Sequence, residues 1–197
     1  MDNILHSVSK HIQGKRIMLK TPEDGDGEMV HDAVVETLDD LRRWPASLPW
    51  ALQEPSLEVF EIFCRKSQSQ LIERVRLNYL VLDAATRSFI GCFGVNRIDW
   101  KVPRFEIGFW CRMSCRGAGY MTESLITLVG FLRCSYGAKR IECFTDLENS
   151  RARLVCERAG MTHEATLRND RITPDGQLRH SVIYSIISQA EDVPPNA

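Results

Sequence analysis

Hydrophobic and polar positions along the chain alternate in two periods, which predict strands and amphipathic helices. Short runs rich in branched and aromatic residues indicate strands at 16–20, 77–83, 89–98, 104–111, 140–147 and 180–188. Apolar residues that recur every three or four positions indicate helices at 29–44, 57–71, 120–137 and 149–160. The order is one strand, two helices, an antiparallel meander and a β-α-β-α-β succession. This order predicts a mixed α/β (α+β) sheet, not a regular doubly wound one.

The two last predicted helices have recognisable ends. Residues 120–137 carry one apolar stripe and stop at Gly137, a residue suited to the left-handed turn that closes a helix. Asn149 is a plausible N-cap of the following short helix, and Gly160 a plausible residue just past its end. The members of the stripe are Met121, Leu125, Leu128, Val129 and Leu132.

The chain length and composition indicate one globular domain. At 197 residues it suits a single core, which we expect to span about residues 12–188, with 189–197 as a frayed tail. A formal net charge of −1 gives no overall electrostatic reason to bind nucleic acid. No run approaches the roughly 20 apolar residues of a membrane span, and no signal-like segment is present. We therefore expect a cytoplasmic protein, either monomer or homodimer.

The seven cysteines are odd in number and lie mostly in apolar runs, without a C-x-x-C pair. They indicate reduced packing residues. Cys111 and Cys115 have no second pair or histidine at ligand spacing, so we expect no metal.

Two glycines stand one residue apart in Arg116-Gly117-Ala118-Gly119, between a predicted strand and a predicted helix. Such a loop can present unpaired N–H groups and a helix dipole to a phosphate, with Arg116 adding a charge. A tight strand-to-helix turn explains the loop equally well. The Lys-Ser/Thr of a P-loop is absent, and the missing third glycine disfavours a Rossmann nucleotide site.

Glu106 stands in the middle of the apolar strand 104–111, on the face that also holds Gly108 and Trp110. A buried carboxylate needs a partner, a solvated cleft or a role as a base. A solvent-facing position or an ion pair with an arginine is an equally good explanation.

In the segment 149–160, Asn149 is either only a cap or also a ligand for amide groups. Arg151 and Arg153 would flank a phosphate-bearing ligand, although arginines on a short helix are commonly just solvated.

Three motifs in this order resemble those of the GNAT superfamily of acyl-CoA-dependent N-acetyltransferases. "FEIGFWC", "RGAGYMTESL" and "NSRARLVCERAGM" are similar to elements of its RimJ/RimL-like branch, which acetylates the N-termini of ribosomal proteins. The resemblance extends from residue 16 to residue 187 and implies a central, mostly antiparallel sheet flanked by helices.

The resemblance also implies acetyl-CoA as cosubstrate, without a metal. The pyrophosphate would lie on the loop and first helical turn formed by Arg116, Gly117, Ala118, Gly119, Tyr120 and Met121. The pantetheine arm would lie along the main chain of Phe109, Trp110, Cys111 and Met113, with Asn149 and Arg153 on the facing helix. Glu106 matches the glutamate proposed as general base.

The chain departs from the family pattern at three positions. Ser114 replaces the usual Gln or Arg at the start of the loop, and Met161 replaces a Phe. Ala152 stands where the family has a serine assigned as the acid, and Ser150 and Cys156 are weak substitutes.

For the acceptor, we expect the α-amine of a protein N-terminus such as that of a ribosomal protein. The alternatives are a small cationic amine (a polyamine or aminoglycoside) and a non-catalytic acyl-CoA-binding protein. Trp44 and Trp50 either wall the acceptor groove or pack the core. An acidic run without Lys or Arg either draws a cationic substrate or is a solvated helix face; its members are Glu23, Asp24, Asp26, Glu28, Asp32, Glu36, Asp39 and Asp40.

Overall fold

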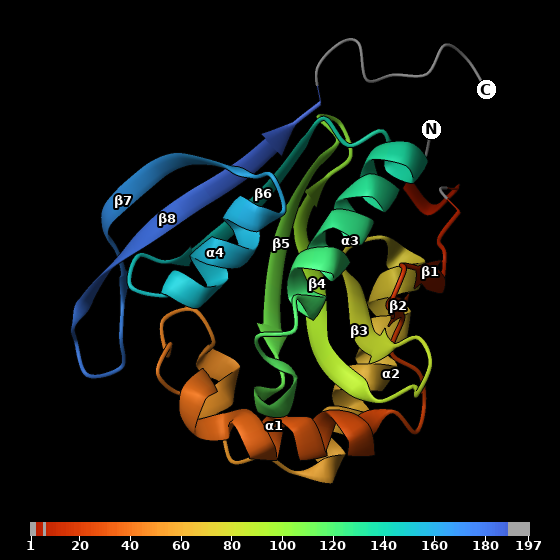
Figure 1. Ribbon diagram of the computed structural model, residues 1–197, viewed down its shortest axis with the longest axis horizontal. Helices are drawn as coiled ribbons and strands as arrows, with labels where there is room; N and C mark the ends of the chain where they lie inside the picture. The colour runs from red at the N-terminus through yellow and green to blue at the C-terminus, as the bar shows by residue number, and fades with distance from the viewer. Residues whose placement is uncertain (1–2, 6, 189–197) are drawn as a thin grey trace.

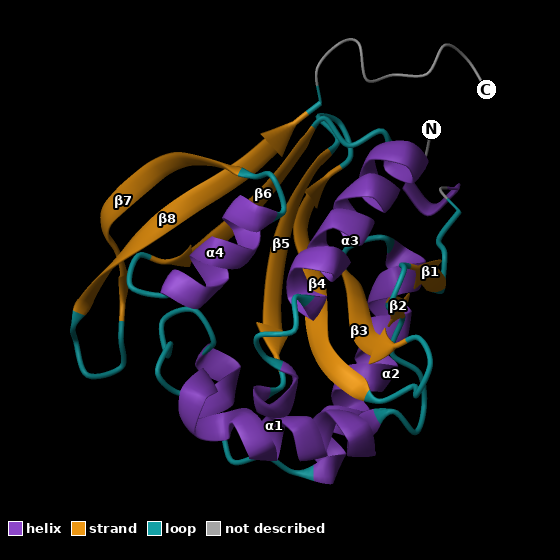
Figure 2. Ribbon diagram, viewed as in Figure 1, coloured by secondary structure: helices purple, strands orange, loops and turns teal. Residues whose placement is uncertain are grey.

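Residues 3–5 and 7–188, which the computed structural model describes, form a sheet covered by helices on both faces (Figure 2). The expected tail 189–197 lies outside the described residues. In chain order the elements are η1 (Asn3–Leu5), β1 (His11–Gln13), β2 (Ile17–Lys20), α1 (Gly27–Leu41), η2 (Pro49–Leu52), α2 (Leu57–Glu73), β3 (Leu77–Asp83), β4 (Phe89–Asp99), β5 (Arg104–Cys111), η3 (Met113–Cys115), α3 (Tyr120–Tyr136), β6 (Arg140–Asp146), α4 (Ser150–Arg158), β7 (Thr162–Ile172) and β8 (Leu178–Ile187).

The strands lie in the order β1-β2-β3-β4-β5-β6-β8-β7. Every neighbouring pair is antiparallel except β5 and β6, which are parallel. A mixed, mostly antiparallel sheet was the expectation from the sequence, and it is confirmed.

Each face of the sheet builds its own core, because successive strand residues point to opposite sides. In β3, Tyr79 and Val81 are buried against the α3 side, and Leu80 and Leu82 against the α1 and α2 side. Figure 1 shows α3 and α4 in front of the sheet, α2 behind it and α1 across its lower edge. All five residues of the predicted apolar stripe are buried in α3, and Gly137 follows it with a φ of +61°.

The helix predicted at 29–44 begins at Gly27 and ends at Leu41. Its early end has a local cause, since Trp44 precedes Pro45 and a residue before proline disfavours the helical conformation.

Two strands were missed from the sequence, β1 and β7. β1 has only three residues. β7 is an edge strand whose residues are mostly exposed, so its side chains show no apolar alternation that would reveal it. The predicted β-α-β-α-β end of the chain therefore contains an extra strand between α4 and β8.

Candidate functional site

β5 and β6 separate near the middle of the sheet and leave a cleft between them. Their pairing runs from Arg104↔Arg140 to Ile107↔Cys143. Beyond Ile107, no strand in the described part of the chain pairs with this edge of β5. The edge faces a cleft of about 720 Å³, which we call the β5–β6 cleft.

Ten of the twelve residues expected to bind the cofactor line the β5–β6 cleft: Phe109, Trp110, Cys111, Met113, Arg116, Gly117, Gly119, Tyr120, Met121 and Asn149. They come from the end of β5, the loop before α3 and the start of α4. The remaining two, Ala118 and Arg153, are not among its lining residues.

The loop before α3 has the backbone that its two glycines allow. Gly117 and Gly119 have φ angles of +80° and +79°, in the left-handed region where a side chain is strained. Gly119 is the N-cap of α3, so the first N–H groups of this helix lack partners within it and carry the positive end of the dipole. This arrangement, with Arg116 beside it, is suited to a phosphate.

Arg16, directly before β2, braces this loop, a role that sequence reasoning missed. Its backbone N–H and Nε donate to the two carboxylate oxygens of Glu123 at 2.6 and 2.8 Å. Its Nη1 donates to the Ala118 carbonyl at 3.1 Å, and its guanidinium lies 4.9 Å from the centroid of the Tyr120 ring. The Ala118 carbonyl is therefore directed to Arg16. No local signal connects residues that lie 107 positions apart.

Burial raises the pKa of the Glu123 carboxyl, but the hydrogen bonds and the charge of Arg16 outweigh it. The resulting pKa lies below the ordinary value of 4.5. The carboxylate in the first turn of α3 therefore stays charged and bound to Arg16 near neutral pH.

α1 holds η3 from the other side of the loop. Glu36 accepts hydrogen bonds from the Arg112 side chain and from the Ser114 N–H, the latter at 2.7 Å. Thr37 Oγ1 accepts from the Met113 N–H at 3.0 Å. The expectation that the main chain binds a pantetheine arm as far as Met113 stays a prediction, and the Met113 N–H already has a partner within the chain. The unpaired edge of β5 from Gly108 to Cys111 remains for this role.

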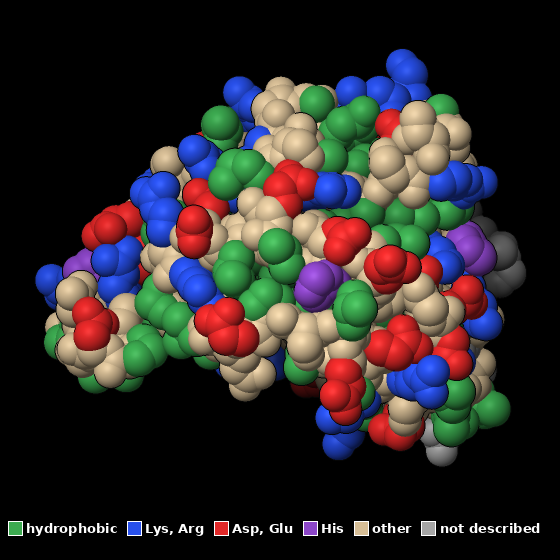
Figure 3. Space-filling view, turned by 90° about the horizontal axis from the view of Figure 1, so that it is seen from below, with side chains coloured by type: hydrophobic (Ala, Val, Ile, Leu, Met, Phe, Trp, Pro, Cys, Tyr) green, Lys and Arg blue, Asp and Glu red, His purple; other side chains and the backbone are tan. Residues whose placement is uncertain are grey.

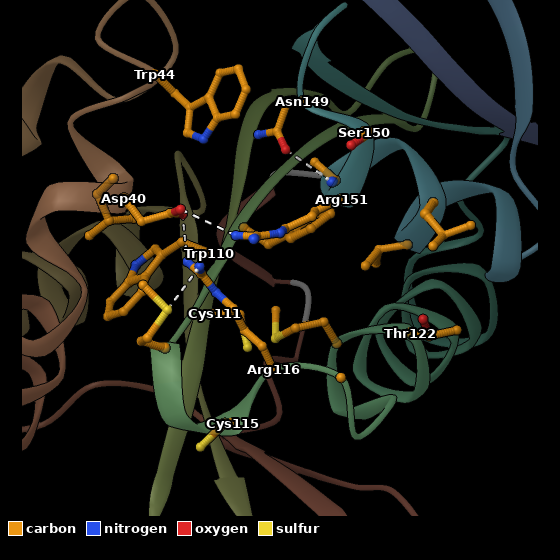
Figure 4. Close-up of a pocket in the computed structure, with 18 of the residues that line it drawn as sticks. Asp40, Trp44, Trp110, Cys111, Cys115, Arg116, Thr122, Asn149, Ser150 and Arg151 are labelled. Carbon is orange, nitrogen blue, oxygen red and sulfur yellow. Dashed lines mark hydrogen bonds and ion pairs between the residues drawn. The ribbon is translucent and has the colours of Figure 1, made fainter.

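Asp40, near the end of α1, joins the two sides of the β5–β6 cleft (Figure 4). It accepts from Arg116 Nη2 at 2.7 Å and from Arg151 Nη1 at 3.2 Å. Both arginines line the β5–β6 cleft. From the sequence, the acidic run that ends at Asp40 either draws a cationic substrate or is a solvated helix face; in the structure the Asp40 carboxylate pairs with two arginines of the β5–β6 cleft.

α4 contributes Asn149 and Arg151 to the cleft, but not Arg153. The Asn149 Oδ1 caps α4 by accepting from the Ala152 N–H at 3.1 Å, which leaves its amide NH₂ for a ligand (Figure 4). Arg153 Nε donates to the Tyr184 hydroxyl at 3.2 Å, and Nη1 to the Leu147 carbonyl at 3.1 Å. Two positions along a helix turn a side chain by about 200°, so Arg151 and Arg153 face different ways. That Arg153 binds the cofactor stays a prediction, but of the two arginines named from the sequence only Arg151 lines the cleft.

The two weak candidates for an acid lie apart. Ser150 is exposed and lines the β5–β6 cleft, whereas Cys156 is fully buried in the core.

Glu106 lies outside the residues that line the β5–β6 cleft, on the face of β5 opposite to Phe109. Its side chain is 17% exposed, and Arg97 Nη1 lies 3.1 Å from its Oε2. That contact is an ion pair without hydrogen-bond alignment, so the buried Oε2 has no hydrogen-bond partner among the described residues. Glu106 is thus an ionisable group with unused acceptor capacity, in register with Asn96 of β4.

A second cleft of about 520 Å³ lies on this face of the sheet, under α2; we call it the α2 cleft. Its floor includes Gly94, Asn96 and Gly108, and its far end is lined by Phe109 and Trp110. The β5–β6 cleft shares Leu48, Phe109 and Trp110 with it, so the two clefts meet at the end of β5. Of the two tryptophans singled out in the sequence, Trp44 lines the β5–β6 cleft and Trp50 the α2 cleft.

The acidic run between residues 23 and 40 is largely neutralised within the chain. Five of its eight acids form ion pairs with Lys or Arg, namely Glu23, Asp24, Asp26, Glu36 and Asp40. Figure 3, which views the molecule from the α1 side, shows acidic side chains mixed with Lys and Arg. The run therefore provides a much weaker field for a cationic substrate than its sequence indicates.

No group of three or more His, Cys, Asp or Glu side chains within residues 3–5 and 7–188 is arranged to hold a metal ion. The helices of the same residues are all too short or too polar to cross a membrane.

A family model described as an acetyltransferase (GNAT) domain matches residues 16–162. No curated protein matches the chain in sequence.

Solved structures share the fold at low identity. A RimL ribosomal L7/L12 α-N-protein acetyltransferase in complex with coenzyme A has a TM-score of 0.82 at 18% identity, covering 90% of this chain and 97% of the other. The microcin C7 self-immunity acetyltransferase MccE, with acetyl-CoA and AMP, has a TM-score of 0.80 at 19% identity, covering 88% and 93%. An acetyltransferase from Salmonella typhimurium that modifies the N-terminal serine of L7/L12 has a TM-score of 0.77 at 19% identity, covering 91% and 99%.

Proposed function

Because the chain belongs to the GNAT acetyltransferase family and is an acetyl-CoA-dependent enzyme, we propose that it acetylates the α-amine at the N-terminus of a protein. A ribosomal protein is the first candidate, since two of the structures with this fold act on one. The observation that carries the proposal is the meeting of two clefts at Phe109 and Trp110. One cleft has the chemistry of a phosphate site, and the other opens on the face that holds Glu106.

The residues of the β5–β6 cleft fit the cosubstrate. Its pyrophosphate would lie on the N–H groups at the start of α3 beside Arg116, and Arg151 would face it from α4. The amide of Asn149 and the free edge of β5 would hold the amide-rich arm. When bound, acetyl-CoA supplies a thioester that an uncharged amine attacks directly, with the coenzyme thiol as leaving group.

The protein's own groups would then prepare the amine and receive its proton. Free N–H groups on the β5 edge polarise a carbonyl placed against them. Glu106 accepts the proton that the amine loses, through a water between them. Ala152 provides no acid, but a thiol pKa of about 8.5 makes the thiolate a tolerable leaving group.

An α-amine suits this set of groups better than a lysine side chain. Its ordinary pKa is about 7.7 to 8.0 against about 10.4 for lysine, so a far larger fraction is uncharged near neutral pH. A single carboxylate without an acid partner is sufficient for that easier substrate.

The proposal is tested by incubating the protein and acetyl-CoA with ribosomal proteins, and separately with spermidine. Thiol release is followed, and mass spectrometry locates the acetyl group. An acetylated N-terminus is the expected product. Acetyl groups only on spermidine or internal lysines would replace it with the small-amine alternative, and acetyl-CoA binding without thiol release from any acceptor would contradict catalysis.

A further inference from the structure

The floor of the α2 cleft is bare where β4 and β5 pair. Gly94 and Gly108 are direct partners across the two strands. A Cβ on Gly94 would lie 3.3 Å from both Arg76 Nη2 and Asn78 Oδ1, and 3.5 Å from Asn96 Nδ2. The missing side chains therefore leave these polar groups reachable from the cleft.

Arg76 is oriented by a buried hydrogen-bond chain. Its Nε donates to Asn78 Oδ1 at 3.1 Å, and Asn78 is only 3% exposed. Asn78 Nδ2 donates to Ser67 Oγ at 2.9 Å, and Ser67 Oγ donates to the Phe63 carbonyl at 2.8 Å. The guanidinium is thereby held at the cleft while its terminal nitrogens remain donors.

A second cation reaches the same cleft from α2. Phe63, Lys66 and Gln70 lie three and four positions apart, on one face of the helix, and all three line the cleft. Neither Lys66 nor Arg76 forms an ion pair with any carboxylate in the described part of the chain.

The carboxylates close to this cleft already have cationic partners. Glu54, which lines it, pairs with Arg42 at 2.6 Å, and Glu106 pairs with Arg97. The unpaired charge of the α2 cleft is therefore positive. Such a site repels a polyamine and attracts an anionic group.

We infer that the α2 cleft selects acceptors that carry a carboxylate close to the reactive amine, with Lys66 and Arg76 pairing with that carboxylate. The inference rests on the proposed function and defines its substrate class as an acidic N-terminal segment. Trp50, Ile62 and Phe63, which also line the cleft, would cover the apolar part of the same segment.

The test compares two amidated peptides with identical sequences except at positions 2 and 3, which are Asp-Asp in one and Lys-Lys in the other. We expect the acidic peptide to have a kcat/KM about tenfold higher. Arg76→Gln and Lys66→Gln should each reduce that preference by about threefold, and Arg76→Glu should reverse it. Free glutamate, as a third acceptor, shows whether the carboxylate must belong to a peptide.

Arg65→Gln is the matched control. Arg65 is the neighbour of Lys66 on α2, but it pairs with Asp24 and Glu61 and does not line the cleft. Its substitution should leave the preference between the two peptides unchanged. A preference that changes equally in the Arg65 and Lys66 variants would assign it to general surface charge and overturn the inference.

Binding of fluorescent peptides, measured apart from turnover, separates this inference from the proposed function. Acetylation of both peptides at equal rates would refute the anion site while keeping the acetyltransferase activity on N-termini. Preferential binding of the acidic peptide without acetyl transfer would support the anion site and refute the proposed function. Efficient acetylation of free glutamate but of neither peptide would overturn the peptide assignment.

Discussion

The two clefts that meet at Phe109 and Trp110 are built in different ways. The β5–β6 cleft is lined by the segment from Phe109 to Thr122 together with the end of α1 and the start of α4, and Asp40 already neutralises Arg116 and Arg151. The α2 cleft is lined by residues from α1, η2, α2, β3, β4 and β5 and from the loops beside them, and its two cations are unpaired. The first has the N–H groups and arginines that suit a phosphate-bearing ligand, and the second has unpaired cations that can discriminate between acceptors.

This comparison predicts that substitutions divide by cleft. Changes in the β5–β6 cleft should alter the affinity for acetyl-CoA. Changes on the α2 face of β5 should alter turnover or the choice of acceptor. Variants that affect both quantities equally would break the distinction.

Glu106→Gln should have the largest effect. Removing the proton acceptor should lower kcat about 100-fold between about pH 6 and pH 9. The affinity for acetyl-CoA, measured by calorimetry, should stay unchanged because Glu106 does not line the β5–β6 cleft. Turnover at the wild-type rate across this range would remove Glu106 from the mechanism.

Gly119→Val should have the second-largest effect, and it should act on the β5–β6 cleft. A branched residue at a φ of +79° would distort the loop and block the approach of a phosphate. We expect acetyl-CoA to bind about 30-fold more weakly, corresponding to roughly 2 kcal/mol of contact with a helix N-terminus.

Gly137→Val is the matched control for this loop substitution. Gly137 has a φ of +61° at the other end of α3, where a Cβ would meet nothing within 4 Å. Gly137→Val should strain the backbone about as much as Gly119→Val does, and it should leave the affinity for acetyl-CoA unchanged. If calorimetry found the affinity of a folded Gly119→Val protein intact, the loop would not be the phosphate site.

Asp40→Asn should have a smaller effect of opposite sign. Without the carboxylate, Arg116 and Arg151 no longer have an internal competitor for an anion, so acetyl-CoA should bind about threefold more tightly. Asp39→Asn, an exposed neighbour outside the cleft, should leave the affinity unchanged. Weaker binding in Asp40→Asn would mean that the carboxylate positions the arginines for the ligand.

The smallest expected effect concerns the Arg16–Glu123 brace. A double-mutant cycle with Arg16→Gln and Glu123→Gln should give a coupling of about 0.5 kcal/mol in urea unfolding at neutral pH. Because the folded-state pKa of Glu123 is below 4.5, this stability is present above that value and lost as the pH falls through the folded pKa. A coupling that persists near pH 2 would show that charge is not its source.

The sequence determined the order of the elements except β1 and β7, and the strand, glycine loop and helix in which we propose the phosphate site, because these features depend on neighbouring residues. The apolar period of α3 and the alternation of β5 are local, and the main chain of residues 116–121 presents the same N–H groups in any fold that continues into the helix. Glu106 and Asn149 were found for the same reason, as a carboxylate within an apolar strand and as a helix cap.

Only the tertiary structure decided which distant side chains meet. Arg16 contacts Ala118 and Glu123, and Asp40 lies between Arg116 and Arg151, across segments whose contact no local pattern encodes. Lys66 and Arg76 likewise line one cleft only in the folded protein. The tertiary structure also decided that the acidic run is neutralised, because the pairing of a charge depends on its position in space and not on its position in the chain. The acceptor was ambiguous from the sequence for this reason, since the α2 cleft is assembled from α1, η2, α2, β3, β4 and β5.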